Sequence, residues 1–218
     1  MSDYTGTVTV GGPAATRHLS ALEITKIAVG SMDNNAYLLR CARTGDALLI
    51  DAANEPGRLL EMIPEGSLRT IVTTHQHGDH WQGLAELVRV TGAGTVAHPL
   101  DAGPLPVRPD RLVEGGDTIA VGAAELSVIH LRGHTPGSIA LRYDDPDGTA
   151  HVFTGDSLFP GGPGRTTSPA DFSTLIGDLE SRIFGELPDD TWVYPGHGAD
   201  TTLGAERPNL PEWRERGW

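Results

Sequence analysis

The sequence contains a single cysteine, Cys41, and a single lysine, Lys26. One cysteine cannot form an internal disulfide, which is consistent with a reducing compartment and leaves His, Asp and Glu as available metal ligands. No apolar run approaches the roughly 20 residues that a transmembrane helix needs. The N-terminus is rich in Gly, Thr and Pro and lacks the apolar segment of a secretion signal, so we predict a cytoplasmic protein.

Positive charge is also scarce: 16 Lys and Arg residues stand against 29 Asp and Glu residues, which gives a formal net charge of -13. An acidic surface repels the phosphates of nucleic acids and of anionic lipids, and the sequence has no basic patch to offset this repulsion. We therefore expect no nucleic-acid partner and no membrane partner. The expected ligand is a small-molecule substrate, and the expected state is a monomer or a homodimer.

Hydrophobic residues make up 38% of the 218 residues, enough for one sizeable core. We predict a single domain over residues 1–218, loosely ordered in residues 1–20, with a proline-rich connection between two halves at residues 99–114. Apolar periodicity predicts helices at 57–63, 80–90 and 172–183 and strands at 22–29, 36–40, 47–51, 70–73, 118–121, 126–131, 139–143, 150–154 and 191–194. In both halves strands are followed by a strand–helix unit, an order that indicates two packed sheets flanked by helices.

Four ligand-type residues, His75, His77, Asp79 and His80, lie together between an expected strand and an expected helix. In extended backbone, residues two apart point to the same side, so His75 and His77 can approach one ion. Gly78 permits a sharp turn that directs Asp79 and His80 toward the same cavity. The alternative, Asp79 as a helix cap beside solvated histidines, explains the cap but not three neighbouring imidazoles. The segment therefore predicts metal ligands.

Three later residues, His134, Asp156 and His197, each lie beside Gly or Pro just after an apolar strand. Strand ends are common places for functional residues, and glycine lets the backbone come close to an ion. Each residue alone is more typical of a turn, with His134 or His197 exposed and Asp156 closing an Asx-turn. Together with the first cluster they supply five histidines and two aspartates, enough for two ions that share a carboxylate.

The segment His-Gln-His-Gly-Asp-His at residues 75–80 resembles the HxHxDH signature of the metallo-β-lactamase superfamily, and the later ligand-type residues follow in the family's order. The resemblance covers nearly the whole chain. It implies an α+β fold, an αββα sandwich of two mixed β-sheets flanked by helices. It also implies two zinc ions, with iron or manganese as alternatives: one held by His75, His77 and His134, a second by Asp79, His80 and His197, and Asp156 bridging them.

Further residues gain roles from the same resemblance. Asp51 is similar to a family aspartate that supports the ligands by hydrogen bonding to them from behind. Its alternative role is that of a turn residue at a strand end. Within the superfamily, residues 35–39, 133–138, 155–159, 164–166 and 194–202 resemble the hydroxyacylglutathione hydrolase (glyoxalase II) branch, which implies a metallo-hydrolase that cleaves thioesters. We expect Arg165, through a bidentate contact to a carboxylate, and Tyr37 to bind substrate, although Arg165 also fits an ordinary surface position.

The implied chemistry is attack by a metal-activated hydroxide, because metal binding can lower the pKa of water from 15.7 to roughly 7. Asp79 is the expected catalytic residue, orienting the nucleophile and carrying a proton. Few residues follow His197, whereas longer family members append a helical domain that grips the thiol carrier, so the carrier could be glutathione or another small thiol. A lactone or another ester is a further alternative. Persulfide dioxygenases resemble the same motifs with a single iron on His75, His134 and Asp156, and oxygen dependence would separate them.

Overall fold

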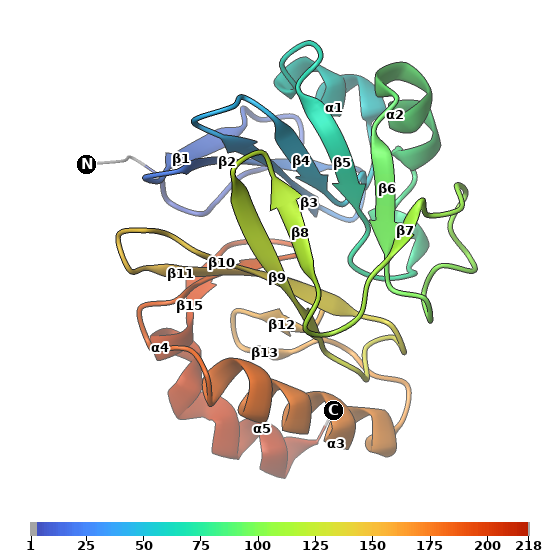
Figure 1. The fold of residues 1–218 in the computed structure, drawn as a ribbon. Coiled ribbons are helices and arrows are strands. Elements are labelled where there is room, and N and C mark those ends of the chain that lie inside the picture. Colours follow the sequence, from blue (N-terminus) through green and yellow to red (C-terminus); the bar gives the residue numbers. More distant parts are fainter. Residues whose placement is uncertain (1–3, 218) are drawn as a thin grey trace.

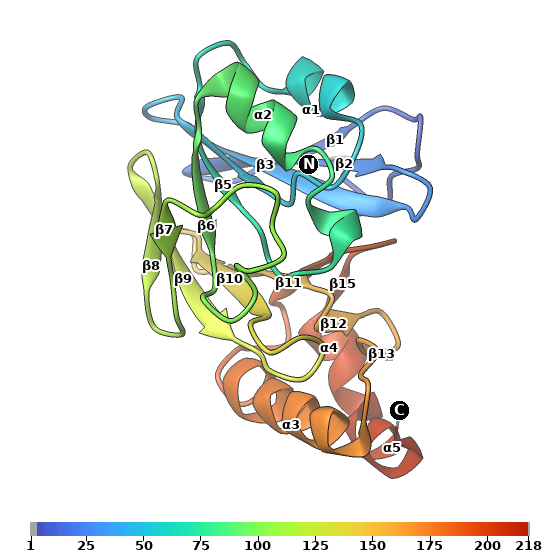
Figure 2. The same cartoon turned by 90° about the vertical axis from the view of Figure 1, so that its right-hand side faces the viewer.

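Two mixed β-sheets pack face to face, and helices cover the outer face of each (Figures 1 and 2). The computed structural model describes residues 4–217. Its layers follow the order helix, sheet, sheet, helix, which confirms the predicted αββα sandwich. None of the helices within the described residues is long and apolar enough to cross a membrane.

The first sheet contains seven strands in sequence order. They are β1 (Ala15–His18), β2 (Leu22–Val29), β3 (Asn34–Cys41), β4 (Ala47–Ile50), β5 (Leu68–Val72), β6 (Gly94–Ala97) and β7 (Arg111–Leu112). The first four pair antiparallel and the last four parallel. Parallel neighbours need crossover connections. Two of these contain helices, α1 (Pro56–Met62) and α2 (Leu84–Thr91).

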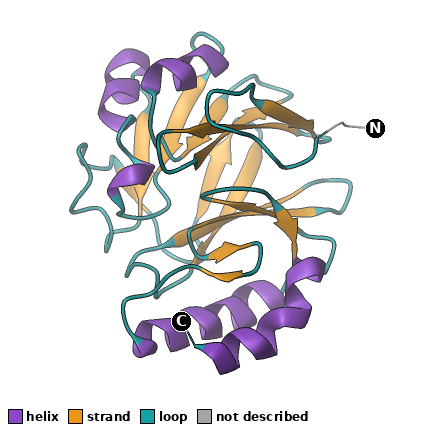
Figure 3. Ribbon diagram, turned by 180° about the vertical axis from the view of Figure 1, so that it is seen from behind, coloured by secondary structure: helices purple, strands orange, loops and turns teal. Residues whose placement is uncertain are grey.

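The second sheet has the order β15-β14-β11-β10-β9-β8. Its strands are β8 (Thr118–Val121), β9 (Ala124–His130), β10 (Ile139–Asp144), β11 (Ala150–Gly155), β14 (Trp192–Pro195) and β15 (Thr201–Thr202). A small hairpin, β12 (Leu158–Phe159) and β13 (Gly162–Pro163), lies beside it. The outer layer, at the bottom of Figure 3, is formed by α3 (Pro169–Leu179), a π-helical turn (Glu180–Phe184), α4 (Leu203–Glu206), a 3-10 turn (Arg207–Asn209) and α5 (Leu210–Arg216).

Three groups of buried apolar side chains hold the four layers together. The middle group lies between the sheets and includes Leu39 and Phe153. The outer groups join each sheet to its helices, through residues such as Leu87 of α2 and Leu175 of α3. Successive side chains of a strand point to opposite faces, so Leu39 reaches the middle core while Leu38 reaches the helices.

Several elements differ from those predicted. The helix expected at 80–90 begins at Leu84, because the backbone N–H groups of Trp81 and Leu84 donate to the carbonyls three residues back, of Gly78 and Trp81, rather than to those four residues back as in an α-helix. A 3-10 turn, Gly78–His80, precedes it. Periodicity also missed β1, β6, β7, β12, β13, β15, α4 and α5, all eight residues or shorter, because so few positions carry little pattern.

The N-terminal segment expected to be loosely ordered, residues 1–20, contains β1, which pairs antiparallel with β2 over four residues. Loose order was therefore the wrong prediction for this strand, since its backbone groups complete the edge of the first sheet. Residues 1–3 lie outside the described residues. The expected connection at 99–114 does pass from the first sheet to the second, but its end forms β7, followed by the buried Val113.

Lys26 in β2 forms a fully buried ion pair with Asp200, at 2.5 Å between Nζ and Oδ1. The same ammonium donates to the carbonyls of Gly6 and Gly198. Gly198 comes directly after His197, so this pair fastens the N-terminal segment and the last ligand-bearing loop to the first sheet.

We predict that Lys26→Ala lowers the free energy of unfolding by about 3–5 kcal/mol, because it leaves the Asp200 carboxylate buried without a counter-ion. Urea unfolding measures the loss. The matched control is Arg69→Ala, which removes the exposed Arg69–Asp46 pair and should cost far less. Equal losses in the two variants would contradict the prediction.

Candidate metal centre

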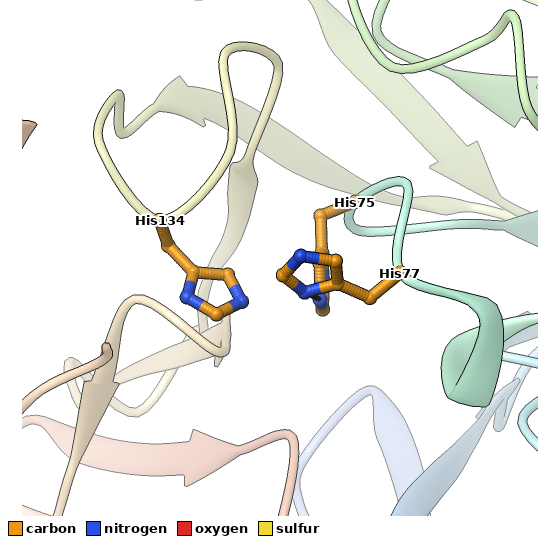
Figure 4. A group of neighbouring side chains, drawn as sticks. All are labelled: His75, His77 and His134. Atoms are coloured by element: carbon orange, nitrogen blue, oxygen red, sulfur yellow. Dashed lines mark hydrogen bonds between the residues drawn. The ribbon is translucent and has the colours of Figure 1, made fainter. Parts of the chain in front are cut away.

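Three imidazoles form a first group of possible ligands, drawn in Figure 4. His75 and His77 leave the end of β5, and His134 comes from the loop between β9 and β10. Figure 4 shows the three rings facing one another, and His75 Nε2 lies 3.1 Å from His77 Nδ1. One possible ligand atom from each residue lies within 4.8 Å of those of the other two.

A second group lies beside the first and contains Asp79, His80 and His197. His80 Nε2 lies 3.2 Å from His197 Nε2. Asp79 Oδ2 lies 3.5 Å from His80 Nε2 and 3.4 Å from His197 Nε2. His197 follows β14, so both groups combine residues from the two halves of the chain.

Asp156, at the end of β11, lies between the two groups. Its carboxylate oxygens are 3.3 Å and 3.4 Å from the Nε2 atoms of His80 and His197. They are also 3.7 Å and 4.0 Å from Nε2 of His134 and His75. The structure thus brings together all seven residues that the sequence analysis proposed as ligands, with Asp156 in the shared position.

Three observations indicate that this cluster fits divalent cations. Two buried polar atoms in it, His134 Nε2 and Asp156 Oδ1, have no hydrogen-bond partner among residues 4–217. A Cβ on Gly196 would lie 2.1 Å from Asp156 Oδ1, so the absence of a side chain there keeps room for the carboxylate. Imidazole nitrogens and carboxylate oxygens are ligands that suit zinc, iron and manganese.

Comparison with known proteins places the fold and this cluster in one family. The family description "Metallo-beta-lactamase superfamily" matches residues 29–197, from β2 to the last histidine of the cluster. The chain belongs to the metallo-β-lactamase superfamily.

Several relatives of this chain are named hydroxyacylglutathione hydrolase. The one from Polaromonas sp. is 36% identical over 166 residues, which cover 75% of this chain and 62% of the relative. The chain thus spans less than two thirds of that relative's length. Among solved structures, TTHA1623 in a di-iron-bound form is 36% identical with a TM-score of 0.68, covering 84% of this chain and 96% of that one. ETHE1 from Myxococcus xanthus is 30% identical with a TM-score of 0.72, and the match covers 86% of this chain and 83% of that one.

Hydrogen bonds on the far side of the rings fix which nitrogen faces the cluster. His134 Nδ1 lies 2.7 Å from the Arg165 carbonyl, and His197 Nδ1 lies 2.8 Å from the Met32 carbonyl. A carbonyl only accepts, so each Nδ1 carries a proton, and Nε2 is left as the nitrogen of each ring that faces the cluster and can bind a metal. Neither carbonyl could be inferred from the sequence, because any residue type supplies one.

Asp51 anchors a ligand from each group. Its Oδ2 lies 2.8 Å from His80 Nδ1 and accepts from the Thr74 hydroxyl. That hydroxyl in turn lies 3.0 Å from His75 Nδ1, so one carboxylate orders both rings. Asp51 has a φ of 58°, a left-handed conformation that costs a non-glycine residue about 1–3 kcal/mol. The position supports the predicted role of Asp51 behind the ligands.

The charges in the second group depend on its carboxylates. Burial lowers the pKa of His80, but Asp51 and Asp156 outweigh it and raise the pKa to about 10. Burial likewise lowers the pKa of His197, which Asp156 and Asp79 raise to about 10. Hydrogen bonding to His197 holds the pKa of Asp79 well below its usual range.

The first group has the opposite balance. Burial lowers the pKa of His75 well below its ordinary value, and the neighbouring His80 adds to this effect. Burial also lowers the pKa of His134, although Asp156 opposes the shift. In the absence of a metal, protons therefore gather on the second group, next to Asp156, while these two rings of the first group are neutral.

Two further residues had been expected to bind substrate. Tyr37 is buried in the middle core, where its hydroxyl donates to the Pro195 carbonyl at 2.6 Å. A substrate-binding role for Tyr37 was therefore the wrong prediction, since its ring is buried in the core and its hydroxyl already donates a hydrogen bond to a backbone carbonyl. The side chain of Arg165 is exposed, and its role stays a prediction. The sequence analysis overlooked Asn34, whose amide donates to Asp79 Oδ2 at 2.8 Å.

We predict that Asp51→Asn weakens Zn²⁺ binding by about 10–100-fold, because an amide has one acceptor oxygen and turns its NH₂ group either toward the Thr74 backbone N–H or toward His80 and the Thr74 hydroxyl, which leaves the rings poorly oriented. Calorimetric titration of the metal-free protein measures the affinity. Asp110→Asn is the matched control, since Asp110 also accepts from a threonine backbone N–H and hydroxyl but lies on the loop before β7. Unchanged affinity in Asp51→Asn would refute the role.

A second prediction concerns protons. At pH 7 the metal-free protein carries protons on His80 and His197, whose pKa values are about 10, so Zn²⁺ binding at the second group should release about two protons. The affinity of the second group for Zn²⁺ should therefore rise between pH 7 and pH 9. Each released proton should contribute about a tenfold increase per pH unit. Titration calorimetry in two buffers of different ionisation enthalpy counts the protons. Binding without proton release would contradict the assignment.

Proposed function

We propose that this chain is a metal-dependent hydrolase that cleaves thioesters of a small thiol carrier, in the manner implied by the glyoxalase II-like resemblance. The observation that carries the proposal is the position of Asp156, in contact with histidines of both groups. A shared carboxylate is typical of paired metal ions. The relatives named hydroxyacylglutathione hydrolase support the thioester substrate. We further propose zinc as the metal and the cytoplasm as the location.

Each ligand group would hold one ion, with Asp156 shared between them. When bound, the cations would polarise an acyl carbonyl and lower the pKa of a bound water from 15.7 to roughly 7. Asp79 Oδ2 lies at this centre and is held by the Asn34 amide, so it is placed to orient the attacking water. Its carboxylate would take the water's proton as the water oxygen bonds to the acyl carbon, and would pass that proton to the thiolate released when the C–S bond breaks, so that the products are an acid and a free thiol.

A cavity beside the first group offers space for the substrate. It has a volume of about 440 Å³ and is lined by residues that include His77, His134, Leu100 and Pro136. This size suits a small molecule. We therefore infer that the small-molecule substrate enters next to His77 and His134, consistent with the acidic sequence and its expected lack of nucleic-acid and membrane partners.

A second candidate function is a persulfide dioxygenase with one iron. It is favoured by one observation: Asp156 Oδ2 lies within 4.0 Å of the Nε2 atoms of both His75 and His134, which gives three ligands for a single ion. The hydrolase is preferred because the second group of ligands is also complete.

We predict that the Zn²⁺-loaded protein hydrolyses a lactoyl thioester without consuming oxygen. His77→Ala and Asp79→Ala should each lower kcat/KM by at least about 100-fold, because losing a ligand exceeds the 10–100-fold effect typical of losing a residue behind one. Thiol release and oxygen uptake are measured on samples of known metal content.

The matched control is His18→Ala, an exposed histidine in β1 that should leave turnover unchanged. Full turnover by His77→Ala or Asp79→Ala would refute the proposed roles. Oxygen uptake with a persulfide by a protein that holds one iron would establish the second candidate instead.

A further inference from the structure

Asp101 is a buried carboxylate outside the ligand cluster, with 1% of its surface exposed. It lies in the turn after β6, in the proline-rich connection between the two sheets. Oδ2 accepts from the Gln76 backbone N–H at 3.0 Å and from the Thr135 hydroxyl at 2.5 Å. Oδ1 accepts from the Gly137 backbone N–H at 2.7 Å. All three donors belong to loops that carry ligands.

The positions of these donors relate Asp101 to the first ligand group. Gln76 stands between His75 and His77, and Thr135 follows His134. The first two ligands come from a loop of the first sheet, whereas His134 comes from a loop of the second. A single side chain from a third segment therefore joins the two loops whose separation sets the shape of this group.

The packing around Asp101 leaves little freedom. A Cβ on Gly137 would lie 2.8 Å from the Asp101 backbone nitrogen and from its Cγ, so only glycine allows this approach. The Thr135 hydroxyl also lies 2.5 Å from the Ser138 hydroxyl, a hydrogen bond within the loop that carries His134. The second ligand group has its own supports, Asp51 and Asn34, and no contact with the Asp101 carboxylate is seen among the described residues.

We propose that Asp101 is a positioning residue that sets the spacing of His75, His77 and His134 and thereby the metal affinity of the first group. The inference rests on the proposed metal-dependent function. It assigns Asp101 no contact with metal or substrate, since its hydrogen bonds go to the loops that hold the ligands.

The test is a Zn²⁺ titration of metal-free Asp101→Asn and Asp101→Ala. Asn keeps one acceptor oxygen but presents N–H donors to at least one of the loops, whereas Ala keeps none. We expect the first group to lose about tenfold in affinity in Asp101→Asn and more in Asp101→Ala, and the second group to keep its affinity. Zinc content after dialysis should fall from two ions per chain toward one.

The matched control is Asp145→Asn. Asp145 is also buried and accepts three hydrogen bonds, from the Ser20 backbone and hydroxyl and from the Tyr143 hydroxyl, away from the cluster. It should lose stability but keep both ions. Amide hydrogen exchange in the metal-free protein gives a readout independent of zinc, because the Gln76 and Gly137 N–H groups should exchange faster only when Asp101 is replaced.

The outcomes separate the two proposals. A wild-type chain that binds no Zn²⁺ would refute the proposed function and the positioning role with it. Wild-type binding of two ions with unchanged affinities in both Asp101 variants would refute the positioning role alone. Equal loss of zinc in Asp145→Asn would also refute it, since that result would reflect stability rather than the spacing of the ligands.

Discussion

This structure depends on one constraint: the imidazole nitrogens and carboxylate oxygens of the ligand cluster must be held facing one another. Five imidazoles and two carboxylates meet at contact distances of 3.1–4.0 Å. Such a cluster requires positive charge, either protons or metal ions. In the metal-free state protons on His80 and His197 supply it, since Asp51 and Asp156 raise the pKa of His80, and Asp156 and Asp79 that of His197, each to about 10. The neutral His75 and His134 keep free lone pairs, so the two groups are unlike before any ion arrives.

The sandwich holds this unfavourable arrangement in place by bringing strand ends together. His75 and Asp51 follow strands of the first sheet, and Asp156 and His197 follow strands of the second. The apolar core between the sheets fixes the distance between these ends, and hydrogen bonds across the loops fix the directions of the side chains. Neither half of the chain contains a complete ligand group, which makes the joining residues as important to the site as the ligands. Asp51 joins ligands of the two groups, and Asp101 joins loops of the two sheets.

The ligands were predictable from the sequence because their chemistry is carried by residue type and their order by the HxHxDH motif and the later strand ends. The long strands were predictable because β2 and β10 alternate or run apolar over six or more residues. Short elements such as β7 carry too few residues to show a pattern. Contacts made by backbone carbonyls, as at Arg165, leave no trace in residue types. Tyr37 was misplaced because its neighbours in sequence match the family, whereas its own side chain points into the core.

We propose that the seven side chains close around two cations. Anomalous diffraction from crystals grown with Zn²⁺, collected on both sides of the zinc absorption edge, tests it most directly. We expect two zinc peaks, one among His75, His77 and His134 and one among Asp79, His80 and His197, both in contact with Asp156. Peaks elsewhere on the surface, with these side chains turned apart and the cluster empty, would contradict it.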